Sequence, residues 1–222
     1  MNTCQIYNKK YELYREYYNP YLLAMVPNGL KVLDVGCSGG QFGKYLVSEK
    51  ECIVFGVDIS DVAITEAKKH LHAACTMDIE YDSFPFDDER FDLIIFGDVL
   101  EHLREPSNVL HKFKKYLKPD GRILASIPNV AHIGIRCRLF WGSWNYRPSG
   151  ILDESHLRFF TLSTAKKLLI DSGFVIIAFK ISPGINIKLS RKFPIIARFT
   201  NTLCRAFPSL FALQFIFLCS KK

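Results

Sequence analysis

The sequence has no acidic residue after Asp171, although eight of its 29 Lys and Arg residues follow that position. The body of the chain is therefore close to neutral, and the net charge of +7 belongs to the C-terminal tail. No recognised RNA-binding module accompanies these basic residues, so we expect no nucleic-acid partner.

Signals for export or membrane insertion are also absent. The N-terminal residues, Met-Asn-Thr-Cys-Gln, contain no apolar stretch, so no signal peptide is expected. None of the seven cysteines has Cys-x-x-Cys spacing, a pattern typical of reduced thiols in a cytoplasmic protein. Pro208 and Gln214 interrupt the apolar run 206–219, which is shorter than the about 20 residues that span a bilayer. We expect a cytoplasmic protein.

Short apolar runs alternate with amphipathic segments along most of the chain. Strands are expected at 31–35, 52–57, 73–77, 91–96, 122–127, 174–180 and 210–218. Helices are expected at 41–50, 60–71, 102–117 and 161–172. Strands separated by helices imply right-handed crossovers, so the pattern favours an α/β fold with a parallel sheet.

The order of these segments indicates three parts. They are an N-terminal helical cap at 1–29, a core at 30–182 with a substrate-covering insertion at 128–160, and a basic amphipathic connection with a final strand at 183–222. The insertion resists assignment, and long loops of this kind are usually functional. Tyrosines recur at helical spacing in the cap. Of these, Tyr11 and Tyr14 are candidates to close over a ligand, the alternative being simple packing on the sheet.

The segment 32–43, Val-Leu-Asp-Val-Gly-Cys-Ser-Gly-Gly-Gln-Phe-Gly, is the most informative part of the chain. A buried strand ends here in Gly36, Ser38 and Gly40, whose small size lets a ligand approach the backbone. The carboxylate of Asp34 would repel the phosphates of a dinucleotide and attract ammonium and sulfonium charges. Together with the lack of Gly-x-Gly-x-x-Gly, this disfavours a nicotinamide oxidoreductase.

Acidic residues follow four consecutive predicted strands, at Asp34, Asp58, Asp78 and Asp98. Any one of them could cap a turn or a helix. Ligands of parallel sheets bind beyond the carboxyl ends of the strands, so together these acids predict one polar rim.

These motifs resemble those of the class I S-adenosylmethionine-dependent methyltransferases, over roughly residues 30–180. The resemblance implies a Rossmann-like α/β fold: a seven-stranded, mostly parallel sheet with helices on both faces and an antiparallel last strand. It also implies S-adenosylmethionine as cofactor. The cofactor-binding residues that it implies are Asp34, Gly36, Ser38, Gly40, Asp58, Ile59, Asp78, Ile79 and Asp98.

The resemblance gives these residues separate roles. The glycine loop would lie under the methionine part of the cofactor, with Asp34 orienting the loop. Asp58 would accept hydrogen bonds from both ribose hydroxyls, and Asp78 with Ile79 would contact the adenine. Ser38 stands where a glycine is more usual, a small departure because serine is nearly as compact.

A narrower likeness concerns the acceptor. Segments 98–103, 126–129 and 150–161 resemble a bacterial subgroup associated with surface polysaccharide or lipid-linked sugar biosynthesis. The resemblance implies O-methylation of a sugar or a lipid-linked glycan precursor, so the expected partner is a glycan or small-molecule acceptor.

Three alternatives stay open. The acceptor could be a small aromatic or isoprenoid hydroxyl, in an apolar pocket formed by Phe140, Trp141 and Trp144. It could be an RNA ribose bound with a divalent metal. The chain could also be a cofactor-binding scaffold without activity.

An alcohol acceptor requires a proton acceptor within hydrogen-bond reach. His102, after the fourth predicted strand, and His156, in the insertion, are the candidate catalytic residues. The candidate substrate-binding residues are Asn129, His132, Tyr146 and Arg158. Structural alternatives exist for both kinds. His102 could simply begin a helix, and Arg158 could form a surface ion pair with Asp153 or Glu154.

Asp98, Glu101 and His102 also resemble a cluster that holds a divalent metal in small-RNA ribose methyltransferases and some ubiquinone-pathway O-methyltransferases. The first position here is Asp instead of Glu, and no second Glu is evident. We therefore expect no metal.

The tail contains Arg191, Arg198 and Arg205 at seven-residue intervals, beside an apolar stripe. A helix is expected after Pro194. A basic amphipathic helix suits an anionic membrane surface, which predicts peripheral contact at the inner face of the membrane through 185–207. The alternative is a helix packed on the sheet with solvated arginines. The sequence leaves the oligomeric state open.

Overall fold

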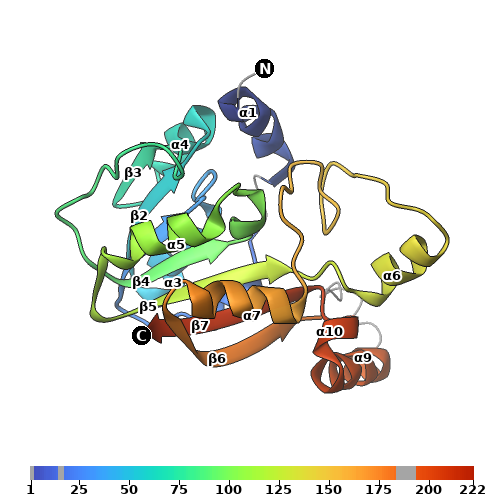
Figure 1. Cartoon of the computed structure of the whole chain (residues 1–222). Helices are drawn as coiled ribbons and strands as arrows, with labels where there is room; N and C mark the ends of the chain where they lie inside the picture. Colours follow the sequence, from blue (N-terminus) through green and yellow to red (C-terminus); the bar gives the residue numbers. More distant parts are fainter. Residues whose placement is uncertain (1–2, 15–17, 184–193) are drawn as a thin grey trace.

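The computed structural model describes residues 3–14, 18–183 and 194–222. Figure 1 shows one twisted sheet with helices on both faces, which confirms the predicted Rossmann-like α/β fold. The seven strands follow the order β3-β2-β1-β4-β5-β7-β6. β7 runs antiparallel to both of its neighbours, and the first five strands pair in parallel.

The strands are β1 (Lys31–Val35), β2 (Ile53–Asp58), β3 (Ala73–Thr76), β4 (Phe91–Gly97), β5 (Leu117–Pro128), β6 (Phe174–Ser182) and β7 (Gln214–Lys221). Two predicted strands had wrong starts. β5 already begins at Leu117, where a register shift against β4 accommodates the following Pro-Asp-Gly. β7 begins only at Gln214, because Pro208 starts a short helix before it.

The helices are α1 (Thr3–Tyr14), α2 (Pro20–Leu23), α3 (Gln41–Lys50), α4 (Asp61–Ala67), α5 (Pro106–Lys114), α6 (Ile133–Phe140), α7 (Leu162–Asp171), α9 (Pro194–Ala206) and α10 (Pro208–Phe211). A 3₁₀ turn, η1, covers Leu100–His102. The predicted helix 102–117 was wrong at its start, because Leu103 is extended and Pro106 fixes the first helical turn.

Two apolar cores sandwich the sheet. Alternate residues of each strand point to opposite faces, so Val32 packs with α2, α3 and α4, whereas Leu33 packs with α5 and α7. In β4, Ile95 and Phe96 divide between the two cores in the same way. This alternation places the polar groups at the strand ends, where the candidate site lies.

The N-terminal cap does not form one continuous helix. α1 ends at Tyr14, whose side chain lies outside the described residues, and α2 begins at Pro20. α1 packs against α4, at the top of Figure 1. The side chain of Tyr11 is buried over Gly39 of the glycine loop.

The tail contains the predicted helix after Pro194, as α9. Arg198 and Arg205 are exposed on it, and Arg191 lies outside the described residues. Within the described ranges, no helix has both the length and the apolar character needed to cross a membrane.

Candidate active site

The glycine loop after β1 is bound tightly to β2. The backbone N–H of Gly36 donates to the carbonyl of Val57, and that of Ser38 donates to Oδ2 of Asp58, both at 2.8 Å. Gly36 has a φ of +74°, and a Cβ there would lie 2.5 Å from Cγ2 of Val99. Only glycine fits this position, so the backbone stays bare toward the rim.

Asp34 lies beneath this loop with an unused acceptor. The residue is buried, and its Oδ2 has no hydrogen-bond partner in the described structure. Burial, followed by the charge of Asp58, raises the pKa of Asp34 to about 7. A buried carboxyl oxygen without a donor is costly, so this position fits a ligand that brings a cationic or N–H donor. The bare loop and the unused oxygen both suit S-adenosylmethionine.

Asp58 holds the loop and the next helix together. Its Oδ1 accepts from the backbone N–H of Ser60, the N-cap of α4, while Oδ2 accepts from Ser38. Each oxygen keeps a second lone pair, so hydrogen bonds from ribose hydroxyls stay a prediction that the geometry allows. Ile59 is half-buried beside it.

The predicted adenine contacts lie after β3. Oδ1 of Asp78 accepts from the backbone N–H of Glu80, which orders a turn. Ile79 is buried, and its carbonyl accepts from Lys112 of α5. Their contact with adenine stays a prediction.

The carboxylate of Asp98 is bound by side chains of β5 and β7. Asp98 has a positive φ of 57°, and its carboxylate accepts from the hydroxyl of Ser126 at 2.9 Å and from Nε2 of Gln214 at 2.9 and 3.0 Å. Gln214 in turn accepts from Asn19, the N-cap of α2. These contacts give Asp98 a structural role in joining β4 to β5 and β7. Its predicted contact with the cofactor stays a prediction.

Tyr11 lies between the loop and a cavity. A Cβ on Gly39 would lie 2.7 Å from Cε2 of Tyr11, so α1 covers this end of the loop. The same tyrosine lines a cavity of about 410 Å³ between α1 and α4. Closure of the cap over a bound ligand stays a prediction, and packing of Tyr11 on the loop is what the structure shows.

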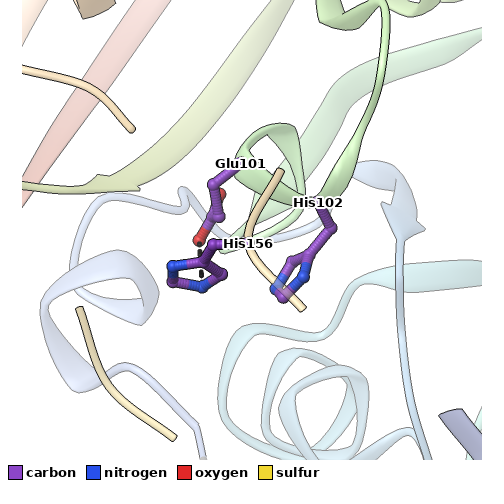
Figure 2. A group of neighbouring side chains, drawn as sticks. All are labelled: Glu101, His102 and His156. Carbon is purple, nitrogen blue, oxygen red and sulfur yellow. Dashed lines mark ion pairs between the residues drawn. The ribbon is translucent and has the colours of Figure 1, made fainter. Parts of the chain in front are cut away.

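The two predicted catalytic residues lie together (Figure 2). The rings of His102 and His156 have centroids 4.7 Å apart, at 73° to each other. Nδ1 of His102 lies 3.2 Å from the carbonyl oxygen of Ser155, and Nδ1 of His156 lies 3.0 Å from that of Ile151. Because a carbonyl only accepts, each Nδ1 carries the proton and each Nε2 keeps its lone pair.

Both imidazoles are neutral at pH 7. Burial, followed by the charge of His156, lowers the pKa of His102 to about 4. Burial also lowers the pKa of His156. Two neutral rings with free Nε2 atoms can accept a proton or bind a cation.

Glu101 completes this group and lies closest to His156 (Figure 2). Its Oε1 is 3.9 Å from Nε2 of His156, and neither carboxyl oxygen has a hydrogen-bond partner in the described structure. Burial, followed by the charge of Asp98, raises the pKa of Glu101 well above its usual value. Both carboxyl oxygens therefore have unused bonding capacity at the site.

The histidines are held by a network from α1. Ser155 accepts from Nζ of Lys10 and donates to Asp153, while Lys10 and Asp153 form a buried ion pair. The ring of Tyr7 stands edge-on to His102, with centroids 5.9 Å apart. Sequence reasoning missed Lys10, Asp153, Ser155 and Tyr7, because nothing local shows that α1 and the insertion meet.

Glu101, His102 and His156 could also hold a divalent cation. Each offers one ligand atom, and these atoms lie within 4.8 Å of one another. One carboxylate with two imidazoles is a known set for transition metals. The set differs from the cluster considered in the sequence, because Asp98 is held by β5 and β7 and His156 takes its place. The expected absence of a metal stays a prediction.

The predicted substrate residues are scattered. Asn129 is fully buried and its amide donates to the carbonyls of Ser209 and Ala212, so it serves the fold. His132 caps α6 through Nδ1, and Tyr146 is largely exposed. Their substrate contacts stay without support.

Of these four residues, only Arg158 lies beside the candidate catalytic residues. It pairs with Glu105 at 3.3 Å, not with Asp153 or Glu154, and it donates to the carbonyl of Arg104. With His156 it lines a narrow cleft that has no room for a water-sized molecule. The residues lining this cleft are Glu101, Pro128, Val130, Ile151, His156, Arg158, Phe159 and Phe160.

The alternative pocket of Phe140, Trp141 and Trp144 was wrong. Phe140 and Trp141 are each 81 % exposed, and only Trp144 turns inward, onto Phe159. The apolar walls near His156 come from neighbouring parts of the insertion.

The sequence matches the family described as "Methyltransferase domain" over residues 8–178, more than half of the chain. The chain belongs to this methyltransferase family. Among curated relatives, the ubiquinone biosynthesis O-methyltransferase of Pasteurella multocida is 33% identical over 125 residues, which are 48% of this chain and 51% of that protein. The chain spans about half the length of the curated relatives it matches.

Solved methyltransferase structures share the fold. The S-adenosylmethionine dependent methyltransferase of Mesorhizobium loti has a TM-score of 0.64 at 19% identity, covering 91% of this chain and 96% of its own. Phosphoethanolamine N-methyltransferase 2 of Haemonchus contortus, in complex with S-adenosyl-L-methionine, has a TM-score of 0.62 at 16% identity. The match covers 96% of this chain and 56% of that one. Membership of the methyltransferase family confirms the predicted enzyme class and cofactor.

Proposed function

We propose that this methyltransferase moves the methyl group of S-adenosylmethionine to a hydroxyl of a small aromatic acceptor, such as one with an isoprenoid substituent. The cleft at His156 supports the proposal by its lining and not by its size, because it has no room for a water-sized molecule and must widen to admit an acceptor. Five of its eight lining residues are apolar, and Glu101, His156 and Arg158 supply the polar groups. Apolar walls with a few convergent polar groups suit a ring whose hydroxyl must be oriented. The observation that carries the proposal is the similarity to relatives named ubiquinone biosynthesis O-methyltransferase.

The donor supplies a methyl group bonded to a positively charged sulfur. The acceptor oxygen forms the new O–CH₃ bond while the S–CH₃ bond breaks, and the sulfur keeps the electron pair as S-adenosylhomocysteine. In this proposal, His156 takes the hydroxyl proton at Nε2, because its Nδ1–H is bound to the carbonyl of Ile151. A histidine whose pKa is lowered is a weak base, so it suits a phenol, with a pKa of about 10, better than a less acidic sugar hydroxyl.

Product analysis with the purified full chain tests the proposal. Release of S-adenosylhomocysteine is measured with polyprenyl-substituted dihydroxybenzenes, sugar nucleotides and lipid-linked sugars as separate acceptors. We expect methylation of the aromatic acceptors, reduced about 10²–10⁴-fold by His156→Ala. His111→Ala, at an exposed position on α5, is the matched control and keeps full activity.

The sugar or lipid-linked glycan acceptor of the polysaccharide-associated subgroup is the competing outcome. Methylation of sugars alone would overturn the aromatic proposal and support that subgroup. Donor binding without turnover on any acceptor would support the scaffold alternative.

A further inference from the structure

The end of α6 presents an unusual apolar surface, which we call the α6 tip (residues 136–141). Phe140 and Trp141 are each 81 % exposed, the highest values among the large apolar side chains of the described structure, and Leu139 is 55 % exposed. The rings of Phe140 and Trp141 meet edge to face, with centroids 5.3 Å apart. A contiguous exposed apolar surface of this kind marks an interaction site.

Positive charge surrounds this tip. Arg136, Arg138 and Arg147 are exposed, and the sequence contains no acidic residue between Asp120 and Asp153. Aromatic rings flanked by guanidinium groups complement an anionic bilayer, where rings enter the headgroup region and guanidinium groups bind lipid phosphates.

A second basic element is attached at the same end of the sheet. The buried amide of Asn129, just before α6, donates to the carbonyls of Ser209 and Ala212, in and just after α10. α9 packs on α10 and exposes Arg198 and Arg205. Figure 1 shows α6, α9 and α10 extending from that end of the sheet. Two basic elements that are far apart in the sequence therefore lie at the same end of the sheet.

We propose that the α6 tip docks on the surface of an anionic bilayer, with Phe140 and Trp141 among the headgroups and Arg136 and Arg138 on lipid phosphates. The membrane contact expected from the sequence at 185–207 extends this surface through α9. Docking brings the insertion, which also contains His156, to the lipid surface. The docking itself does not depend on which acceptor the enzyme uses.

Vesicle co-sedimentation of the full chain tests the docking. We expect binding to phosphatidylcholine vesicles that contain phosphatidylglycerol, and little binding to phosphatidylcholine alone. Replacing both rings, Phe140→Ser with Trp141→Ser, lowers the binding by at least on the order of tenfold. Arg136→Ser with Arg138→Ser lowers it by a similar factor and removes most of its salt dependence. Tyr81→Ser, at a 71 % exposed position on another loop, is the matched control and binds like the wild type.

Fluorescence distinguishes insertion from simple adsorption. The chain has two tryptophans, so Trp144→Phe leaves Trp141 as the single reporter. We expect its emission to shift to the blue on anionic vesicles and to be quenched by brominated lipids. An unquenched Trp141, or equal losses in the ring variant and in Tyr81→Ser, would overturn the proposal.

Self-association is the other decisive outcome. If light scattering shows a dimer that the ring variant abolishes while vesicle binding is unchanged, a second copy covers the tip and the docking proposal is wrong. Methylation of a soluble acceptor by the ring variant stays normal in either case, so failure of docking leaves the proposed enzyme activity intact.

Discussion

Lys10 of α1 and Asp153 of the insertion form a buried ion pair across 143 positions of the chain. Lys10 also donates to Oγ of Ser155, and Ser155 contacts Nδ1 of His102 through its carbonyl and its hydroxyl. The position of the N-terminal helix is thereby coupled to the orientation of a candidate catalytic ring.

Breaking this pair should destabilise the cap. Lys10→Met removes the cation from the buried Asp153 carboxylate, and we expect a loss of roughly 3–5 kcal/mol in the free energy of unfolding, measured by urea denaturation. The exposed neighbour Lys9→Met is the control and should cost little. Lys10→Met with Asp153→Asn should recover part of the loss. Equal effects of Lys9→Met and Lys10→Met would contradict the role of the pair.

The glycine loop permits a matched comparison between two glycines of similar φ. Gly36 and Gly29 have φ values of +74° and +73°, but only at Gly36 would a Cβ meet another side chain, that of Val99. Alanine at either position costs about 1–2 kcal/mol of backbone strain. We expect Gly36→Ala alone to abolish S-adenosylmethionine binding in calorimetry. Retained binding in Gly36→Ala would remove the loop from the donor site.

Stability should depend on pH through His102. Its pKa is about 4 in the folded chain and about 6.5 when unfolded, so between these values the unfolded chain binds a proton that the folded chain does not. The free energy of unfolding therefore rises with pH across this window, by up to about 3 kcal/mol. As the pH falls from 6.5 to 4, the same contribution of His102 is lost. His102→Gln should flatten the slope measured by denaturation between pH 4 and 6.5.

Glu101 should act in the opposite direction. Because burial raises the pKa of Glu101, the folded carboxyl holds its proton to a higher pH than the unfolded one does. This group therefore lowers stability as the pH rises above the ordinary pKa of a glutamic acid. Glu101→Gln should steepen the increase of stability with pH. A slope that neither variant changes would show that other groups control the acid transition.

Metal removal tests the expected absence of a cation. A base at His156 needs its Nε2 lone pair, and a bound cation would occupy the same atom. We therefore expect enzyme dialysed against EDTA to keep its activity, with no gain on adding Mn²⁺ or Zn²⁺. Activity that is lost with EDTA and restored by a metal, together with metal binding that Glu101→Gln abolishes, would assign a metal site to Glu101, His102 and His156.

Local sequence signals predicted the fold and the backbone conformation of the glycine loop well. Helix α3 was expected at its observed bounds, and Ser60 and Gly36 act as their residue types indicate. Such signals depend on neighbouring residues only, because helix caps, helix-breaking residues and alternating burial act over one or two helical turns or a few strand residues.

Contacts between distant segments could not be predicted. The carboxylate of Asp98 is held by Gln214 and Ser126, and Arg158 pairs with Glu105. Each of these partners depends on how the sheet and the insertion fold back, which no local pattern encodes. The exposure of Trp141 was missed for a related reason. In a loop without assigned structure, the sequence does not distinguish an aromatic residue that lines a pocket from one that lies on the surface.

The strand order also has a consequence for biosynthesis. Among the described strands, β6 pairs with β7 alone, and β7 spans Gln214–Lys221. A nascent chain that has emerged only as far as Ser182 therefore holds β6 without its native hydrogen-bonding partner. The sheet can be completed only after translation has passed residue 221. Until then the edge of β5 that pairs with β7 is exposed, and chaperones or other strands can bind to it.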